Sequence, residues 1–355
     1  MSVWKLSILA IVLGFLVGFG LLAPRSEGTG PISTDVRWSI EDTTVHATVT
    51  KPRHSEGRGP AVLFVAGSGP TSRDWTSPLL EGENGSARLL AEVLAERGYV
   101  TLRYDKRTTG PDAMPNILKL TGKISMASHL AEVASAVKFL AARSDVDPSR
   151  IYILTSSEGA IHALNYVRGN PDIPLAGMIL TGAPGRTIGA VAETQVGAIL
   201  SRSEDAEALL ASYKQAVDAF LVGKEMVVDP KFPVAVQQVL GALAAPVNQP
   251  FVRELWALDI APWLAEVTIP TLVVIGKKDI QVDWQLDGQP LEVQAARNPA
   301  VSFAYPEDAN HVLKYEPKAR EALTPADVAT YNLPSQVLDP ETVTRILEWL
   351  HSQDS

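Results

Sequence analysis

The chain of 355 residues carries a formal net charge of −9, is 46% apolar and 20% charged, and contains no cysteine. These fractions are ordinary for a globular protein of one large or two modest domains, and they exclude collagen-like, disordered and disulfide-stapled chains. The acidic balance argues against a nucleic-acid partner, whose phosphates need a basic surface, and the missing cysteines exclude cysteine nucleophiles, thiolate zinc sites and iron–sulfur clusters.

Residues 1–25 predict an export segment rather than part of the fold. Leu6–Ala23 is an uncharged apolar run of 18 residues. As a helix it measures about 27 Å, just enough for a hydrocarbon core of roughly 30 Å. A cleaved signal peptide needs an A-x-A-like site, and Gly18-x-Gly20 fits that pattern poorly. We therefore expect an exported protein, anchored in the membrane by this segment or released by cleavage into the periplasm or the extracellular space. The Gly-, Pro- and Ser-rich residues 26–34 predict a linker.

The body of the chain alternates predicted strands and helices, taken here in chain order. A hairpin comes first, and buried strands then alternate with amphipathic helices up to residue 185. The expected elements are Val36–Glu41, Val45–Thr50 and Ala61–Val65 (strands), Ser86–Arg97 (helix), Val100–Tyr104 (strand), Met126–Arg143 (helix), Ile151–Leu154 (strand), Glu158–Val167 (helix) and Met178–Thr181 (strand).

Strand signals vanish between residues 186 and 266 and return afterwards. The elements expected from there on are the helices Ala190–Leu200, Ala206–Phe220, Val234–Leu243 and Val252–Leu264, the strands Thr271–Ile275 and Val301–Tyr305, and the helix Pro340–His351. The alternation predicts an α/β fold with a mostly parallel central sheet flanked by helices. Its core would comprise residues 35–185 and 267–355, with residues 186–266 inserted as a helical cap.

A candidate nucleophile follows the strand Ile151–Leu154, where Thr-Ser-Ser-Glu-Gly leads into a helix. This strand–turn–helix setting holds a nucleophilic serine on a sharp turn, which needs small residues two positions before and two after it. The spacing indicates Ser157, because Gly159 follows it, whereas Ser156 would be followed by Glu158. A serine that merely caps the helix is the structural alternative.

A serine nucleophile needs a base and a carboxylate that orients the base. On sheets of this kind the order along the chain is Ser, then Asp or Glu, then His. Asp279 and His311 each follow one of the last two predicted strands, so both are expected at carboxyl ends of the sheet, where such folds place their sites. Asp283 and Asp308 are the rival carboxylates.

Backbone N–H groups should stabilise the negative oxygen that forms during the reaction. We expect one from Glu158, directly after the nucleophile. We expect the other from Ser68, in the loop Ala-Gly-Ser-Gly-Pro after the strand Ala61–Val65. The glycines of that loop let the backbone approach a substrate, and they also suit a tight turn with no further role.

These motifs together resemble the α/β-hydrolase superfamily and, within it, bacterial serine carboxylesterases. The matching motifs are G-S-G-P-x-x-R-D at 67–74, R-Y-D-K-R at 103–107, S-E-G at 157–159 and N-H-V-L-K at 310–314, and the resemblance covers roughly residues 35–350. It implies hydrolysis of carboxylic esters (EC 3.1.1.-) through an acyl-enzyme, with Ser157, Asp279 and His311 as the triad under a helical cap. We expect esters with small to medium acyl chains as substrates, and the mechanism requires no metal or organic cofactor.

The resemblance leaves the role of four charged residues open. Arg73, Asp74, Asp105 and Arg107 follow two neighbouring strands. We interpret them as an ion-pair network beside the site, with recognition of an acidic substrate by an arginine as the alternative. Relatives often have Gly after the R-Y-D-K-R motif where this chain has Thr108, which leaves the conformation of that loop open.

Other functions share parts of this pattern. An acyltransferase or thioesterase would use the same triad. A non-catalytic, membrane-tethered binding protein would keep the scaffold but predicts a missing triad member, and all three are present. A peptidase is disfavoured because the chain has no propeller-sized partner domain. Trp256, Trp263 and Trp284 are candidates either for lining the cleft or for packing in the core.

Overall fold

The computed structural model describes residues 30–54 and 57–354. Within these ranges no helix is both long enough and apolar enough to cross a membrane. The predicted membrane segment Leu6–Ala23 lies outside the described residues, so export and anchoring stay predictions.

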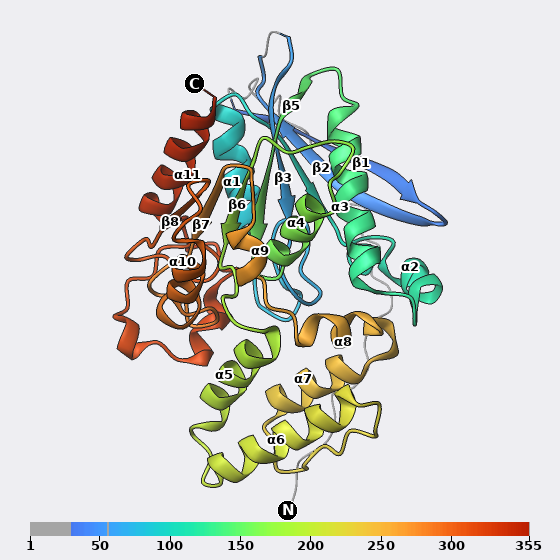
Figure 1. The fold of residues 1–355 in the computed structure, drawn as a ribbon, viewed down its shortest axis with the longest axis vertical. Coiled ribbons are helices and arrows are strands. Elements are labelled where there is room, and N and C mark those ends of the chain that lie inside the picture. Colours follow the sequence, from blue (N-terminus) through green and yellow to red (C-terminus); the bar gives the residue numbers. More distant parts are fainter. Residues whose placement is uncertain (1–29, 55–56, 355) are drawn as a thin grey trace, which may run out of the picture.

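A mixed sheet of eight strands forms the centre of the described chain (Figure 1). The strands are β1 (Ile32–Ile40), β2 (Thr43–Lys51), β3 (Gly59–Val65), β4 (Val100–Tyr104), β5 (Val146–Ser156), β6 (Gly177–Thr181), β7 (Thr271–Val274) and β8 (Val301–Ala304). Their order is β1-β2-β4-β3-β5-β6-β7-β8. β3 to β8 run parallel, and β2 is antiparallel to both of its neighbours. The predicted mostly parallel sheet is confirmed.

Helices connect the strands and cover the sheet. They are α1 (Ser86–Glu96), α2 (Ala113–Leu120), α3 (Met126–Ala141), α4 (Gly159–Arg168), α5 (Ile188–Leu200), α6 (Ala206–Leu221), α7 (Val234–Ala244), α8 (Phe251–Trp256), α9 (Ala261–Ala265), α10 (Gln289–Ala295) and α11 (Pro340–Gln353). Short turns of 3₁₀-helix occur at Pro246–Asn248, Arg320–Ala322 and Pro325–Thr330, and a π-helical turn occurs at Trp284–Gly288.

The side chains of β3 show how the sheet separates two hydrophobic layers. Successive residues of a strand point to opposite faces. Val62 and Phe64 pack in a layer with α1 and α11. Ala61, Leu63 and Val65 pack in the larger layer with α3 and α4. The continuous apolar run of this strand is therefore explained by burial on both faces.

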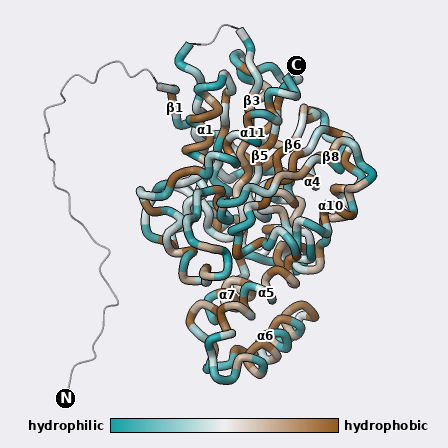
Figure 2. The backbone as a smooth tube through the Cα atoms, turned by 90° about the vertical axis from the view of Figure 1, so that its left-hand side faces the viewer, coloured by the Kyte–Doolittle hydropathy of each residue, from teal (hydrophilic) through white to brown (hydrophobic). Residues whose placement is uncertain are grey.

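Helices α5 to α8 lie together beyond the carboxyl ends of the parallel strands, at the bottom of Figure 1. Figure 2 shows α5, α6 and α7 set apart from the sheet at the same end. They share a small hydrophobic core of their own, which includes Val196, Leu209, Tyr213 and Leu240. Residues 188–256 thus form the helical cap of this fold.

The predicted cap (186–266) extends too far. The expected helix Val252–Leu264 is two short helices, α8 and α9, because Pro262 occupies the first turn of α9 and cannot sit inside a longer helix. The Asp259 carboxylate accepts a hydrogen bond from the Ala261 amide where α9 begins. Leu264 is fully buried, and α9 packs mainly against α10 and α4, two helices that cover the sheet, so we place α9 with the core.

Other boundaries also differ from those predicted. The linker predicted for residues 26–34 extends too far, because β1 already begins at Ile32. Two helices, α2 and α10, were not predicted. Each has a proline within its first three residues, Pro115 in α2 and Pro290 in α10, where the missing N–H costs least. Such prolines read as breaks in the sequence although they begin helices.

Candidate active site

Ser157 lies on the sharp turn between β5 and α4. Its backbone φ is +52°, a left-handed conformation that is uncommon for residues other than glycine. Its amide donates a hydrogen bond to the Thr181 carbonyl at 2.8 Å. A Cβ atom at Gly159 would come within 2.6 Å of the Val65 carbonyl oxygen, so a larger residue would disrupt the turn. These contacts place Ser157, and not Ser156, at the tip of the turn.

His311 and Asp279 form a buried pair. The Nδ1 atom of His311 is 2.7 Å from Oδ2 of Asp279, and the two side chains are 8% and 1% exposed. The other carboxylate oxygen of Asp279 accepts hydrogen bonds from the amides of Gln281 and Val282 at 2.8 and 2.9 Å. An imidazole held by its Nδ1 atom in this way keeps Nε2 free to exchange a proton.

The rival carboxylates have other partners. Asp283 forms an ion pair with Arg320 and accepts hydrogen bonds from two backbone amides at the start of the π-helical turn. Asp308 forms an ion pair with Lys278 at 2.7 Å. Of the three candidates only Asp279 contacts the imidazole.

The end of β6 joins Ser157 to the His311–Asp279 pair. The Thr181 carbonyl accepts the hydrogen bond from the Ser157 amide. A Cβ atom at the next residue, Gly182, would lie 3.1 Å from Cε1 of His311. The imidazole therefore packs against the strand end that holds the serine. Within the described residues the Ser157 hydroxyl makes no hydrogen bond to His311; such contacts are often long without substrate and shorten when it binds.

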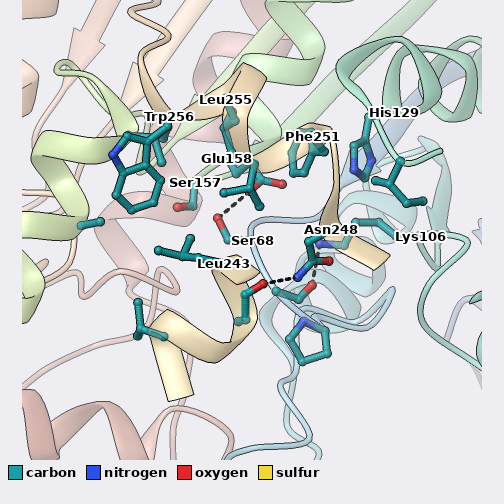
Figure 3. A pocket seen from close by; sticks show the side chains of 18 of the residues that line it. Ser68, Lys106, His129, Ser157, Glu158, Leu243, Asn248, Phe251, Leu255 and Trp256 are labelled. Atoms are coloured by element: carbon teal, nitrogen blue, oxygen red, sulfur yellow. Dashed lines mark hydrogen bonds between the residues drawn. The ribbon is translucent and has the colours of Figure 1, made fainter. Parts of the chain in front are cut away.

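The two amides predicted to bind the oxyanion are unpaired. Within residues 30–54 and 57–354, neither the Ser68 N–H nor the Glu158 N–H donates a hydrogen bond. The side chains of the same two residues are joined, because Ser68 Oγ donates to Glu158 Oε2 at 2.8 Å. Both residues line the same cavity as Ser157 (Figure 3).

A buried network continues from Glu158 into the core. Its Oε1 atom is 3.2 Å from Nε2 of His162, and since a carboxylate can only accept, Nε2 carries the proton. Burial acts to raise the pKa of Glu158, but the His162 hydrogen bond and the charge of Lys106 outweigh it and lower this pKa to about 2. Burial lowers the pKa of His162 in turn, against the opposing effect of Glu158.

The network reaches the next helix through stacked rings. His162 on α4 stacks on His129 of α3, with ring centroids 4.7 Å apart. His129 Nδ1 lies 3.6 Å from Glu132, whose other oxygen accepts a hydrogen bond from Arg107 Nε at 2.9 Å. The sequence analysis missed this network, because α3 and α4 meet only in the fold. Its one sequence signal is the helical spacing of Glu158 to His162 and of His129 to Glu132.

Lys106 is a further buried group beside the site that sequence reasoning missed. Its ammonium donates hydrogen bonds to the carbonyls of Gly67 and Gly69 at 2.6 and 2.7 Å. Burial lowers the pKa of Lys106, and the charges of Glu158 and Glu132 partly oppose this effect. The motif of residues 103–107 marked this lysine without giving it a role.

The cavity above Ser157 has a volume of about 470 Å³ and lies between the cap and the carboxyl ends of the strands. Its wall is largely apolar, with Val191, Leu243, Phe251, Leu255 and Trp256 contributed by the cap. Figure 3 shows Leu243, Phe251, Leu255 and Trp256 around Ser157, Ser68 and Glu158. Such an apolar wall suits the apolar part of a ligand, for example an acyl chain.

The tryptophans and the four charged residues singled out in the sequence have separate places. Trp256 lines the cavity, whereas Trp263 packs under the Arg168 guanidinium and Trp284 packs against Tyr305.

The charged residues form ion pairs away from the cavity. Arg73 pairs with Asp105 at 2.7 Å, Arg103 pairs with Asp74, and Arg107 pairs with Glu132. The cavity-lining residues do not include them, which favours the structural interpretation. In the described part of the chain no group of three or more His, Cys, Asp or Glu side chains is arranged to hold a metal ion.

Known proteins match both the sequence and the fold. The sequence model of the alpha/beta hydrolase family matches residues 62–322. The YtaP protein of Bacillus subtilis (strain 168) is 30% identical over 120 residues, which are 32% of this chain and 40% of YtaP, so the chain spans about two fifths of that relative.

Solved structures resemble the whole described fold. The proline iminopeptidase of Mycobacterium smegmatis has a TM-score of 0.53 at 15% identity, with 90% of this chain and 99% of that chain covered. The esterase Pf2001 of Pyrococcus furiosus has a TM-score of 0.52 at 16% identity, with 91% and 93% covered. At these identities the likeness concerns the fold. Because the family's sequence model covers well over half of the chain and its sheet and helices have the corresponding arrangement, this protein belongs to the alpha/beta hydrolase family.

Proposed function

We propose that this protein is a serine hydrolase that cleaves carboxylic esters with small to medium acyl chains through an acyl-enzyme. The observation that carries the proposal is the left-handed Ser157 at the base of an apolar cavity, next to the hydrogen-bonded pair of His311 and Asp279. A family member that has a nucleophile turn and unpaired amides at one cavity, and a paired imidazole packed against the strand end that holds the nucleophile, has the parts that acyl transfer to water needs.

The proposed reaction has two halves. His311 takes the proton of the Ser157 hydroxyl as its oxygen attacks the ester carbonyl, and Asp279 holds the imidazole and stabilises its positive form. The amides of Ser68 and Glu158 bind the oxyanion. The alcohol leaves with the proton from His311. A water molecule, activated by the same imidazole, then releases the acid and restores the serine.

The size of the chain does not exclude a peptidase, contrary to the sequence analysis. The iminopeptidase structure is covered over 99% of its own length, so a peptidase on this fold needs no propeller. An aminopeptidase does need a free carboxylate to bind the substrate's amino group. Of the described residues that line the cavity only Glu158 has a carboxylate, and Ser68 and His162 already occupy it. This occupation favours an ester substrate.

We further propose that the protein is exported and held at the membrane by Leu6–Ala23, as the apolar length of that segment suggests. No cofactor enters the proposed reaction.

The test is turnover of p-nitrophenyl esters from acetate to palmitate, with an aminoacyl p-nitroanilide alongside, by the wild type and by S157A. Ester turnover that the variant loses, with a maximum at short or medium chains, is the expected result. Preference for the anilide would favour a peptidase. Transfer to an added alcohol or thiol at the expense of hydrolysis would favour an acyltransferase. Full ester turnover by folded S157A would overturn the proposal.

A further inference from the structure

Lys106 stands apart from the charged residues around it. Arg103, Asp105 and Arg107 each form an ion pair, whereas Lys106 forms none within 4 Å among the described residues. It is only 6% exposed, and its hydrogen bonds go to two backbone carbonyls. A buried ammonium without a counter-ion in contact is costly, so its contacts call for a functional explanation.

The two carbonyls belong to the residues on either side of Ser68. The carbonyl of Gly67 and the N–H of Ser68 are part of the same planar, trans peptide unit, so they point in opposite directions. An ammonium that fixes the Gly67 oxygen therefore also fixes the direction of the Ser68 N–H, away from the lysine. The second bond goes to the Gly69 carbonyl, which lies in the Gly69–Pro70 peptide, so the lysine holds the backbone on both sides of Ser68.

The backbone of this loop is intrinsically flexible, and apart from Lys106 its Ser68 carbonyl accepts one hydrogen bond, from Thr71 Oγ1 at 2.7 Å. Gly69 has a positive φ of +72°, and glycine on both sides of Ser68 leaves the backbone free to rotate. At Gly67 a Cβ atom would lie 3.2 Å from Cβ of Ser157, so the loop passes directly beside the nucleophile. A small rotation here would move the Ser68 amide out of line with an oxyanion formed at Ser157.

A second tether acts on the same residue. Ser68 Oγ donates to the Glu158 carboxylate, which joins the side chains of the two residues whose amides are proposed to bind the oxyanion. Glu158 is itself held by His162. Lys106 and Glu158 thus fix Ser68 from opposite ends, through its backbone and through its side chain.

We propose that Lys106 is a positioning residue that orients the Ser68 amide for oxyanion binding, with the Ser68–Glu158 hydrogen bond as the second tether. This proposal rests on the proposed function, because it assumes an oxyanion at Ser157. Electrostatic stabilisation by fixed donors needs no reorganisation during the reaction, and removing one donor outright costs about 10²–10³-fold in kcat. Loss of orientation should cost part of that.

The experiment compares the full-length wild type with K106M, K106Q and S68A. S68A removes the side-chain tether but keeps the amide. K51M is the matched control. Lys51 forms an ion pair with Asp145, which also pairs with Arg143, and none of these three residues lines the cavity. Two readouts are used: kcat and KM for p-nitrophenyl butyrate, and the rate at which an alkyl fluorophosphonate modifies Ser157. That modification forms a Ser157 O–P bond with loss of fluoride and also places a phosphorus-bound oxygen at the oxyanion site.

We expect K106M to lower kcat and the phosphonylation rate about 30- to 100-fold with KM within threefold. K106Q keeps an uncharged NH2 group as hydrogen-bond donor. On a logarithmic scale it should recover at least a third of the kcat that K106M loses. S68A should lose about threefold to tenfold, and K51M should stay within twofold. If K106M does not fold, as judged by circular dichroism, K106Q and S68A decide.

Two results would overturn the proposal. The first is a kcat within threefold of wild type in folded K106M or, if K106M does not fold, in both K106Q and S68A. The second is a loss of activity that comes from a raised KM alone. Failure of the proposed function looks different. A wild type without ester turnover but with Ser157 labelled leaves the phosphonylation rates to test Lys106. Equal labelling of the wild type and S157A would remove Ser157 as the nucleophile, and the positioning role with it.

Discussion

Asp279 differs from the other carboxylates at this end of the sheet in the groups that face it. Both Asp279 and Asp283 accept hydrogen bonds from two backbone amides, but the third partner of Asp279 is the His311 imidazole and that of Asp283 is Arg320. A carboxylate held by three donors keeps a fixed orientation and so fixes the imidazole. Asp283, four residues later, can be substituted without removing a contact of the Asp279–His311 pair.

This contrast gives a prediction at the scale of one residue. D279N should lower kcat about 10³- to 10⁴-fold, because an amide can hold the imidazole in the wrong tautomer and cannot stabilise its positive form. D283N is the matched control and should keep kcat within about threefold, although it removes the ion pair to Arg320. Steady-state kinetics on p-nitrophenyl butyrate measure both. D279N with more than a tenth of the wild-type kcat would show that Asp279 is not the orienting carboxylate.

Sequence reasoning finds residues of this kind only when the chain itself carries the signal. Ser157 stands in a recognisable turn, and Asp279 and His311 follow strands, so the sequence predicts that all three lie at the same edge of the sheet. His129 and His162 follow no such rule. They lie inside different helices, and only the packing of α3 on α4 brings their rings together. The sequence contained Lys106 within the motif of residues 103–107 but gave no indication of its role.

At the scale of elements, α8 connects the cap to the buried network. Phe251 is the first residue of this helix; its ring lies 4.4 Å from that of His129 and 5.8 Å from that of His162. It also lines the cavity. One side chain therefore lines the cavity and also packs against the imidazole that holds Glu158.

We predict that F251A lowers the free energy of unfolding by about 3 kcal/mol, since a buried phenylalanine leaves a cavity when truncated. The space it leaves should shift the preference in kcat/KM toward longer acyl chains. F139A is the matched control, because Phe139 stacks on Trp38, with ring centroids 4.8 Å apart, and is not among the cavity residues. Urea unfolding and a series of p-nitrophenyl esters measure the two effects. An unchanged chain-length profile in F251A would place the acyl chain elsewhere.

The elements that could not be predicted share a cause. Proline and short helices break the periodic patterns on which the predictions depend, as at Pro262 in the first turn of α9. The strands and the longer helices were found because their patterns persist over many residues. The end of the cap was misplaced because apolar spacing shows that α9 is buried without showing which core buries it.

At the scale of the whole molecule, the proposed location at the membrane depends on the N-terminal segment Leu6–Ala23. We predict that the full chain sediments with membranes and resists extraction by salt and carbonate, because 18 uncharged apolar residues can span the hydrocarbon core. A chain beginning at Arg25 should stay in the supernatant with its esterase activity. Immunoblots of the fractions measure both. Full-length protein in the soluble fraction at its unprocessed mass would contradict the anchor, and a shortened soluble form would indicate cleavage.

The stability of the whole fold should also depend on pH through Glu158. Its pKa is about 2 in the folded protein against an ordinary value of 4.5. A folded-state pKa that is lowered in this way means that the carboxylate stabilises the fold at pH values above 4.5. This contribution is then lost as the pH falls through the window from 4.5 to about 2. E158Q removes the charge and leaves an amide that can still accept from Ser68.

The difference in unfolding free energy between wild type and E158Q should therefore be constant from about pH 7 to pH 5 and shrink steadily below it. Urea unfolding at intervals down to pH 3 measures this difference. E83Q is the matched control, since Glu83 is exposed and lies outside the network. A difference that stays constant or grows in acid would show that Glu158 does not hold its charge against burial. The hydrogen bonds from Ser68 and His162 would then be those of a neutral acid, and the second tether of the oxyanion loop would lose its ionic character.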